Sequence, residues 1–368
     1  MRVTEPYTLF PRKLKSGMIV YYYQYRLQNG NRSNPKSTGC TTLSSAKRFC
    51  NKLYNSGEFE KTSSTKFEIF SLNFFEKESE FFKWKQINRE NITDSTLQRY
   101  KQLLKYQILP FFSDYQLSAI SKQDVKNWII CASEKWSAKT VNNAQTVLNI
   151  ILNQAVDKNI IEFNPAQNLS FRKTEKKERQ LLTVAEIKKS YDSPLWNNDY
   201  LKKAFLLAAI TGMRISEVAG LQNSDVFQDY IDVKHSYNRK FGLGQTKTKA
   251  YRKVPIPTDF KLYNDSSDWI FPSLSNDKPF DIVRLLDKLH QIWADLGIDY
   301  KSRNLTTHTL RNFFISYLQS ENVPESKIRA TVGHKDSSMT SLYTYWEPSM
   351  LEEVYKAQYK LYKEITNG

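Results

Sequence analysis

Apolar residues recur every three to four positions through the middle of the chain, a spacing that predicts amphipathic helices. One helix is expected over residues 96–109, where it stops at Pro110, and a second starts at Ser121. A third is expected over residues 140–155, with its apolar residues along one stripe. Together these elements predict an all-α domain over residues 66–169.

The first 62 residues have a different pattern. Residues 18–27 are rich in β-branched and aromatic side chains, which predicts a strand, and Asn29-Gly30 is a strong turn signal. A short helix is expected to follow and to end at Leu53. We therefore expect a small α+β module over residues 1–62.

Residues 175–368 combine helical spacing with strand-like segments. A capping-box pattern at residues 183–186 predicts the start of a helix. Residues 230–233 and 252–256 predict a β-hairpin whose turn is rich in Gly, Lys and Thr. The tail over residues 351–365 repeats apolar and aromatic residues at helical spacing. This part should be a mainly α domain with a small β-hairpin, which makes three domains in all.

The charge of the chain indicates a polyanionic partner. Its 54 Lys and Arg outnumber its 38 Asp and Glu, giving a net charge of +16. Half of this excess lies in residues 1–62, which carry eleven Lys or Arg and three Glu. A membrane surface is the less favoured polyanion, because no apolar run approaches the roughly 18 residues of a spanning helix and the amino terminus lacks a signal-peptide core.

The cysteine and histidine residues argue against a metal or disulfide framework. Cys40, Cys50 and Cys131 form no metal-ligand pairs, which fits a reducing cytoplasm. The four histidines are scattered, and no segment resembles a nucleotide-binding glycine loop. We expect a protein that uses no metal, no ATP and no other cofactor.

Residues suited to phosphate lie together near the carboxyl end. His308 and Arg311 are three apart and share one face of a predicted helix, while Tyr343 lies nine residues beyond His334. An arginine fork, imidazoles and a phenol suit an anionic phosphate better than a carbonyl or a metal. The group indicates phosphoryl chemistry on a tyrosine, although each residue taken alone is more typical of a solvated helix face or a helix end.

A matching group lies upstream. Gly212 is predicted to end a buried helix and to let Arg214 project at the break, with Glu217 one turn on to hold neighbouring groups by hydrogen bonds. Lys247 and Lys249 lie on the predicted hairpin turn. Taken alone, the Arg214–Glu217 pair fits an ordinary surface ion pair at a helix corner.

In these motifs the chain resembles the tyrosine recombinases of the phage-integrase family. The family's catalytic set is an arginine in a Thr-Gly-x-Arg-x-x-Glu box, a lysine on a β-hairpin, a His-x-x-Arg box, a Gly-His dipeptide and a tyrosine. The order and spacing agree over roughly residues 66–360. The matching positions are Arg214 with Glu217, Lys247, His308 with Arg311, His334 and Tyr343.

Two positions differ from the family's pattern or leave a choice open. Tyr345 stands two residues after the expected nucleophile, where the family often has a histidine. Lys247 is favoured over Lys249 as the hairpin lysine by counting back from Pro255.

The resemblance implies a mechanism without metal or hydrolysis. Arg214 and Arg311 would bind the non-bridging oxygens of one scissile phosphate, and Tyr343 would attack to form a 3′-phosphotyrosyl link. Lys247 would protonate the departing 5′ oxygen.

The remaining members of the set have supporting roles by resemblance. His308 and His334 would hydrogen-bond the phosphate or help move the nucleophile's proton, and Glu217 would orient the other groups.

The first two domains also resemble parts of this family. Residues 1–62 resemble the module that many integrases use to hold accessory "arm" DNA, and residues 66–169 resemble the core-binding domain. A solvated basic domain and a generic helical bundle are the simpler alternatives. The candidate DNA-binding residues of the first module are Arg12, Lys13, Lys15, Arg26, Lys47 and Arg48.

The expected function is site-specific integration or excision of a mobile element in the nucleoid-associated cytoplasm. The expected partners are double-stranded DNA and three further copies of the chain, with an accessory DNA-bending protein as a further candidate. The tail over residues 351–365 would dock on a neighbouring subunit or pack on its own domain. A type IB topoisomerase-like nicking–closing enzyme and a non-catalytic DNA-binding regulator on a recombinase scaffold are the alternatives.

Overall fold

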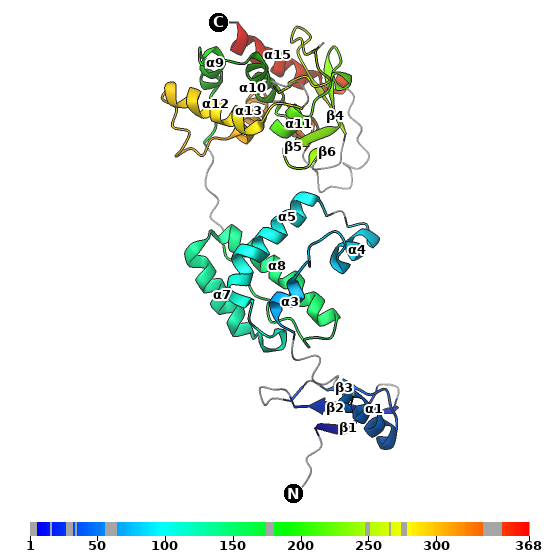
Figure 1. The fold of residues 1–368 in the computed structure, drawn as a ribbon. Coiled ribbons are helices and arrows are strands. Elements are labelled where there is room, and N and C mark those ends of the chain that lie inside the picture. Colours follow the sequence, from blue (N-terminus) through cyan, green and yellow to red (C-terminus); the bar gives the residue numbers. More distant parts are fainter. Residues whose placement is uncertain are drawn as a thin grey trace. The chain divides into compact units, whose positions relative to one another are not determined.

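The chain divides into two compact units, Met1–Lys176 and Lys177–Gly368 (Figure 1). Among the described residues, the first unit holds two hydrophobic cores that share no residue, and the second unit holds one. The computed structural model describes residues 6–367 except for 15–16, 27–31, 34, 56–64, 91, 174–179, 247–250, 265, 274–277 and 334–347.

The amino-terminal module is a three-stranded antiparallel sheet with one helix packed on it. β1 (Tyr7–Lys13) pairs with β2 (Ile19–Tyr25) along its whole length, and β3 (Lys36–Ser37) pairs with the other edge of β2. α1 (Leu43–Asn55) contributes Cys50 to a core shared with buried tyrosines of β1 and β2. Alternation along the strands brings these tyrosines to one face of the sheet.

The helical domain of the first unit packs around α8 (Ala138–Asp157). Its buried residues recur at helical spacing, as the sequence pattern predicted. The other elements are α3 (Phe67–Ser71), α4 (Glu80–Ile87), α5 (Asp94–Leu103), η1 (Leu104–Ile108), α6 (Leu109–Phe112), η2 (Leu117–Ala119) and α7 (Lys122–Lys135).

The prediction that one uniform helix stops at Pro110 is wrong. α5 continues into η1, a π-helical turn in which the N–H of Leu109 bonds to the carbonyl of Leu104, and Pro110 then lies in the first turn of α6. Proline is tolerated in a first helical turn because the N–H that it lacks has no helical acceptor there.

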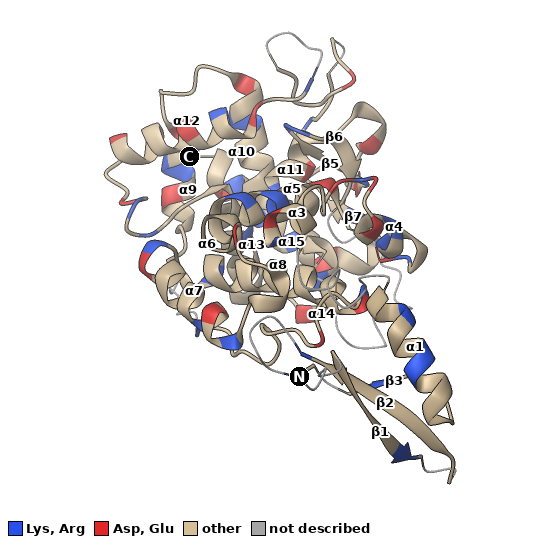
Figure 2. Cartoon of the chain, turned by 60° about the horizontal axis from the view of Figure 1, so that its bottom comes forward, with Lys and Arg blue, Asp and Glu red and all other residues tan. Residues whose placement is uncertain are grey.

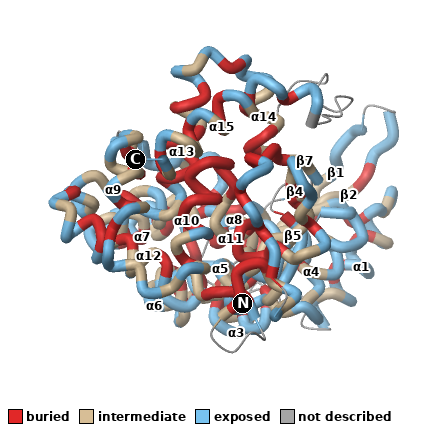
Figure 3. The backbone as a smooth tube through the Cα atoms, turned by 90° about the horizontal axis from the view of Figure 1, so that it is seen from above, coloured by how far each residue is buried: buried red, intermediate tan, exposed pale blue. Residues whose placement is uncertain are grey.

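The second unit is mainly helical and is built around α10 (Asp199–Thr211), which is buried along most of its length. Figure 3 shows buried positions along α10 and the neighbouring α13. The helices of this unit also include α9 (Val184–Asp192), α11 (Ile215–Ala219), η3 (Asn223–Asp225), α12 (Ile282–Asp295), α13 (Thr307–Ser320), α14 (Glu325–Val332), η5 (Pro348–Leu351) and α15 (Glu352–Thr366).

Two small antiparallel sheets lie in this unit. β4 (Tyr230–Val233) pairs with β7 (Arg252–Pro255), which are the two predicted arms. Between them, β5 (His235–Asn238) and β6 (Gly242–Gln245) form a second hairpin that the sequence pattern did not indicate. The Gly-Leu-Gly-Gln sequence of β6 lacks the β-branched and aromatic residues by which strands are recognised.

The carboxyl-terminal helix α15 packs within its own unit. It contacts α9, α10, α13 and α14, and it buries Val354, Leu361 and Ile365. The buried amide of Gln358 donates to the carbonyls of Ile210 (2.9 Å) and Pro255 (2.8 Å). The tail therefore completes the core of the second unit in this single chain.

The predicted fold class is confirmed: a small α+β module, an all-α domain and a mainly α domain with small sheets. The boundaries 1–62, 66–169 and 175–368 stay a prediction. No helix within the described ranges is both long and apolar enough to span a bilayer.

Candidate active site

The first arginine of the site projects from a break between two helices. α10 ends at Gly212, whose φ of 62° is left-handed, and a Cβ there would lie only 2.6 Å from Cδ1 of Phe314. Glycine meets both requirements. The chain then turns so that Arg214 becomes the N-cap of α11.

Glu217 closes this turn. Its Oε2 accepts from the backbone N–H of Arg214 (2.9 Å), and its Oε1 accepts from Nη1 of the same residue (2.7 Å). The side chain of Glu217 is 1% exposed. Burial acts to raise the pKa of Glu217, but Arg252 and Arg214 outweigh it and leave the pKa below its ordinary value. Glu217 is therefore a buried carboxylate that carries its charge at neutral pH.

Arg311 is a buried cation with open donors. It lies on α13 with 1% of its surface exposed, and its Nη1 donates to the carbonyl of Gly212 (3.0 Å). Within the described part of the chain, nothing accepts from its Nε or Nη2. Burial, and then repulsion by Arg214 and Arg252, lower the pKa of Arg311 to about 9. Unused donors on a buried guanidinium are suited to an anion that brings its own charge.

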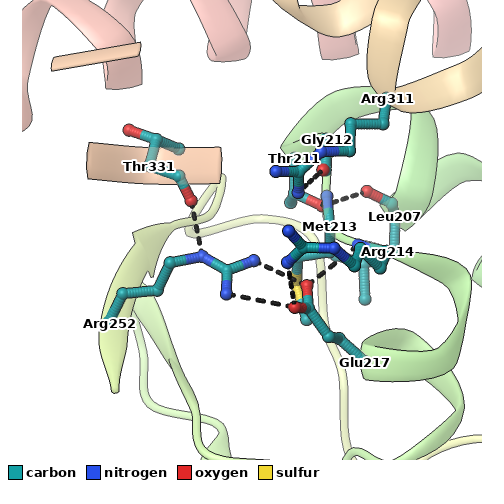
Figure 4. A network of polar contacts seen from close by, with 9 residues as sticks. All are labelled: Leu207, Thr211, Gly212, Met213, Arg214, Glu217, Arg252, Arg311 and Thr331. Carbon is teal, nitrogen blue, oxygen red and sulfur yellow. Dashed lines mark hydrogen bonds and ion pairs between the residues drawn. The ribbon is translucent and has the colours of Figure 1, made fainter. Parts of the chain in front are cut away.

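A third arginine, which the sequence analysis missed, completes the group. Arg252 of β7 donates from Nη2 and Nη1 to the two carboxylate oxygens of Glu217 (2.6 and 3.3 Å) and from Nε to the carbonyl of Thr331 (2.7 Å). Figure 4 shows Arg252 and Arg214 reaching Glu217 from opposite sides. We call Arg214, Arg252, Arg311 and Glu217 the arginine cluster.

Strand alternation could have indicated Arg252. It lies two residues before Val254 and opposite Val233, both of which are buried, so it belongs to the inward face of the β4–β7 pair. A cation on a buried face requires a buried partner, and Glu217 is that partner.

His308 lies at the start of α13, one turn before Arg311, as predicted from the three-residue spacing. Thr306 caps this helix, with its backbone N–H donating to Oγ1 of Thr309 (2.9 Å). His308 is exposed whereas Arg311 is buried. The helix therefore carries an exposed imidazole one turn before a buried guanidinium.

The other predicted members, Lys247, Lys249, His334 and Tyr343, lie outside the described residues, as does Tyr345. Gly333, which precedes His334, is left-handed (φ 69°) and caps α14. A Cβ on Gly333 would lie 3.1 Å from Cδ and Nη1 of Arg252. The chain therefore leads from the arginine cluster directly into His334.

The described basic residues of the amino-terminal module lie on different elements. Arg12 and Lys13 lie at one end of the β1–β2 pair, and Arg26 follows the other end. Arg12 pairs with Val20, and Arg26 lies six residues beyond Val20, a distance of roughly 20 Å along a strand. Lys47 and Arg48 are exposed on α1, where Figure 2 shows Lys and Arg in blue. Lys15 lies outside the described residues.

The arrangement suits one anionic group. Three guanidiniums against one carboxylate leave the arginine cluster with a net charge of +2. Within the described ranges, no group of His, Cys, Asp and Glu is placed to hold a metal ion. The chemistry available is the binding and polarisation of a phosphate by guanidinium donors.

Two family models match the chain. One, described as the phage integrase family, matches residues 172–349, and the other, the phage integrase N-terminal SAM-like domain, matches residues 79–130. The first includes the whole arginine cluster and the second lies in the helical domain.

Curated relatives are similar over about three quarters of the chain. Tyrosine recombinase XerD of Halalkalibacterium halodurans is 24% identical over 288 residues, which cover 75% of this chain and 95% of the relative. The prophage ps2 probable integrase of Lactococcus lactis is 23% identical over 310 residues, covering 74% of this chain and 79% of the relative.

Solved structures share the fold. The Tn1549 transposon integrase, in complex with a circular intermediate DNA, covers 73% of this chain and 95% of its own, with a TM-score of 0.57 and 19% identity. A lambda integrase dimer bound to a COC′ core site covers 94% of this chain and 98% of its own, with a TM-score of 0.56 and 17% identity.

Proposed function

The chain belongs to the phage integrase family of tyrosine recombinases, enzymes that cleave and rejoin DNA strands through a catalytic tyrosine, and we propose that it is a site-specific recombinase that integrates or excises a mobile element. Its substrate is double-stranded DNA, and its covalent intermediate is a 3′-phosphotyrosyl link to Tyr343.

The observation that carries this proposal is that the buried guanidinium of Arg311 has two nitrogens without an acceptor among the described residues. A buried guanidinium with two open nitrogens is costly unless an anion enters. Arg214, 20% exposed at the same helix break, supplies a second fork from the side. Two such forks match the two non-bridging oxygens of a phosphodiester.

The proposed chemistry conserves the phosphate bond energy. The phenol oxygen of Tyr343 attacks phosphorus as the bond to the 5′ oxygen breaks, while Arg214 and Arg311 stabilise the charge that develops on the non-bridging oxygens. Lys247 gives a proton to the departing 5′ oxygen. The 5′ hydroxyl of a partner strand then reverses the step, so that strands are exchanged without hydrolysis.

His308 and His334 bind the phosphate or move the proton that Tyr343 releases. Glu217 orients the other groups, which is consistent with its buried position between two arginines. Lys249 remains the alternative to Lys247 on the hairpin.

The separate basic module before residue 62 favours an element integrase. It carries eleven Lys or Arg against three Glu, which suits a second DNA-binding module. We propose that residues 1–62 bind arm-type DNA, that residues 66–169 bind core DNA and that residues 175–368 are the catalytic domain.

The proposed assembly is four protomers on DNA in the nucleoid-associated cytoplasm, since two strands are exchanged in each of two duplexes. A lambda integrase tetramer bound to a Holliday junction shares the fold (TM-score 0.55, 18% identity). We propose that the tail, which packs on its own unit in the single chain, docks on a neighbouring subunit in this assembly. An accessory DNA-bending protein is a further proposed partner.

The test uses nicked duplexes of random sequence, from which covalent adducts of the full chain are recovered under denaturing conditions and sequenced. The recovered duplex is then offered to Tyr343→Phe and, as the matched control, Tyr345→Phe. We expect Tyr343→Phe to bind this duplex with unchanged affinity and to form no adduct, while Tyr345→Phe forms adducts normally.

Two outcomes would change the proposal. Cleavage by Tyr343→Phe would make Tyr345 the next candidate nucleophile. A plasmid carrying two copies of the recovered site should yield recombined circles, and relaxed circles alone would indicate a topoisomerase-like nicking–closing enzyme.

A further inference from the structure

We propose that Arg252, which lies outside the proposed catalytic set, is a positioning residue that fixes Arg214 through Glu217 and holds the chain that leads into His334. The inference rests on the proposed function, because it concerns the phosphate site of the same reaction.

The first support is the geometry around the carboxylate of Glu217. Its Oε2 accepts from the backbone N–H of Arg214 (2.9 Å) and from Nη2 of Arg252 (2.6 Å). Its Oε1 accepts from Nη1 of Arg214 (2.7 Å) and from Nη1 of Arg252 (3.3 Å). With two donors on each oxygen, the carboxylate cannot rotate without breaking bonds to both arginines. Arg252 therefore limits where the guanidinium of Arg214 can lie.

The second support is the contact with the end of α14. Nε of Arg252 donates to the carbonyl of Thr331 (2.7 Å), in the last turn of that helix. The side chain of Arg252 also lies against Gly333, where an added Cβ would be only 3.1 Å from Cδ and Nη1 of Arg252. One guanidinium thus ties the Arg214 turn to the segment that precedes His334, although 35 and 79 residues separate it from Glu217 and Thr331.

The burial of Arg252 argues for positioning and not for direct contact with substrate. Its side chain is 7% exposed, and each of its three nitrogens already donates to a protein acceptor. Its charge still acts on the site, since it is one of the neighbours that lower the pKa of Arg311. Arg252 brings the charge of the arginine cluster to +2, which matches a phosphodiester whose charge grows from one toward about two as phosphorus becomes five-coordinate.

Arg303 offers a matched control. It makes the same kind of contacts elsewhere in the unit: Nη1 and Nη2 donate to the two oxygens of Glu186 (2.6 and 3.1 Å), and Nη2 also donates to the carbonyl of Leu181 (2.6 Å). Replacing Arg303 removes a comparable ion pair from the same unit and leaves the arginine cluster intact.

The experiment measures the rate of adduct formation at saturating DNA on the duplex recovered from the random library. Arg252→Met should slow the reaction about a hundredfold, the scale expected when catalytic groups move by about an ångström. Arg252→Lys restores the charge but not the fork, so it should slow the reaction about tenfold. Arg303→Met should react at the wild-type rate once the rates are corrected for the folded fraction.

A second substrate separates positioning from loss of fold. A methylphosphonate at the scissile position replaces one charged non-bridging oxygen by a neutral methyl group, so it places less demand on the guanidiniums. On this substrate the effect of Arg252→Met should shrink to less than about tenfold. A folding defect would slow both substrates by the same factor.

The inference is overturned if Arg252→Met reacts at the wild-type rate, if it slows both substrates equally, or if Arg303→Met is slowed as much. In each of these cases the wild-type chain still forms its adduct, so the proposed function survives. Failure of the wild-type chain to form an adduct with any duplex of the library would instead overturn the proposed function, and this inference with it.

Discussion

The guanidinium of Arg311 lies in the protein interior, and no carboxylate among the described residues accepts a hydrogen bond from it. Among the described residues it donates only to the carbonyl of Gly212, and two further guanidiniums lie near enough to lower its pKa. Burying a charge without a partner costs several kcal/mol after relaxation. We therefore expect the buried guanidinium of Arg311 to lower the free energy of unfolding while it provides donors for an anion.

We predict that Arg311→Met stabilises the protein and strongly slows its chemistry. Methionine fills a similar volume without the buried charge, so the free energy of unfolding should rise by about 1–3 kcal/mol. Loss of the Arg311 guanidinium should slow adduct formation by about a hundredfold to a thousandfold. Denaturant unfolding and the rate of adduct formation measure the two effects.

Arg303→Met is the control for this variant as well. Because Arg303 is paired with Glu186, its removal should lower the free energy of unfolding by about 1–3 kcal/mol. If Arg311→Met destabilised the protein to the same degree, the guanidinium would be a structural cation and not an open anion site.

Glu217 provides a pH-dependent prediction. Its pKa is lowered in the folded state, so its contribution to stability is complete above its ordinary pKa of 4.5 and is lost as the pH falls through the lowered value. Glu217→Gln leaves three guanidiniums without a carboxylate, which should cost about 3–5 kcal/mol at neutral pH. The difference from wild type in urea unfolding should narrow below pH 4.5. A difference that stayed constant down to pH 3 would mean that Glu217 is not held as a charged carboxylate.

At the scale of elements, the helix break at Gly212 is the feature on which the site depends. We predict that Gly212→Ala is far more damaging than Gly297→Ala. Both glycines are left-handed (φ 62° and 68°), which costs a side chain about 1–2 kcal/mol, but a Cβ at Gly297 meets nothing within 4 Å.

At Gly212 the added methyl group would overlap Phe314, so the free energy of unfolding should fall by a further amount of about 1–3 kcal/mol. Thermal unfolding of the two variants measures this difference. The carbonyl that receives Arg311 would move with the turn, so adduct formation should fall as well. Equal stability losses in the two variants would show that the contact with Phe314 relaxes without cost.

Local signals predicted several of the elements. The capping box of α9, the glycine end of α10, and the arms β4 and β7 all depend on residues close together in sequence, and each is confirmed. The π turn before Pro110 was missed because proline as a stop and proline in a first turn have the same local pattern. The hairpin of β5 and β6 was missed because its glycines resemble a loop.

The parts of the site that could not be predicted depend on contacts between residues far apart in the sequence. Spacing placed Arg214, Glu217, His308 and Arg311 on the correct elements. The role of Arg252 depends on Glu217 and Thr331, far away in sequence, and is set only when β7 packs against α14. Lys247, His334 and Tyr343 stay a prediction.

At the scale of the whole molecule, the positive charge is unevenly distributed along the chain. The first 62 residues, with eleven Lys or Arg against three Glu, carry half of the net charge, whereas the arginine cluster lies in a different unit with its own core. Binding by the first module should therefore depend on salt without influencing the rate of strand cleavage.

We predict that deleting residues 1–62 weakens DNA binding and reduces its salt dependence, but leaves the adduct rate at saturating DNA unchanged. Each phosphate that the protein no longer neutralises should reduce the slope of log K against log salt by about 0.9, so a module that neutralises about five phosphates should change it by about 4–5. Binding titrations across a salt series measure the slope, and a nicked duplex measures the rate.

The full-length chain with its six candidate DNA-binding residues replaced by Gln separates charge from the fold of the module. If ion pairs with phosphate dominate, this variant should reproduce the slope of the deletion, because neutral side chains release no counterions. A slope that fell only on deletion would assign binding to other parts of the sheet and helix. An adduct rate that fell in both variants would show that the first module acts on the catalytic unit, contrary to the separation of their cores. The replaced residues are Arg12, Lys13, Lys15, Arg26, Lys47 and Arg48.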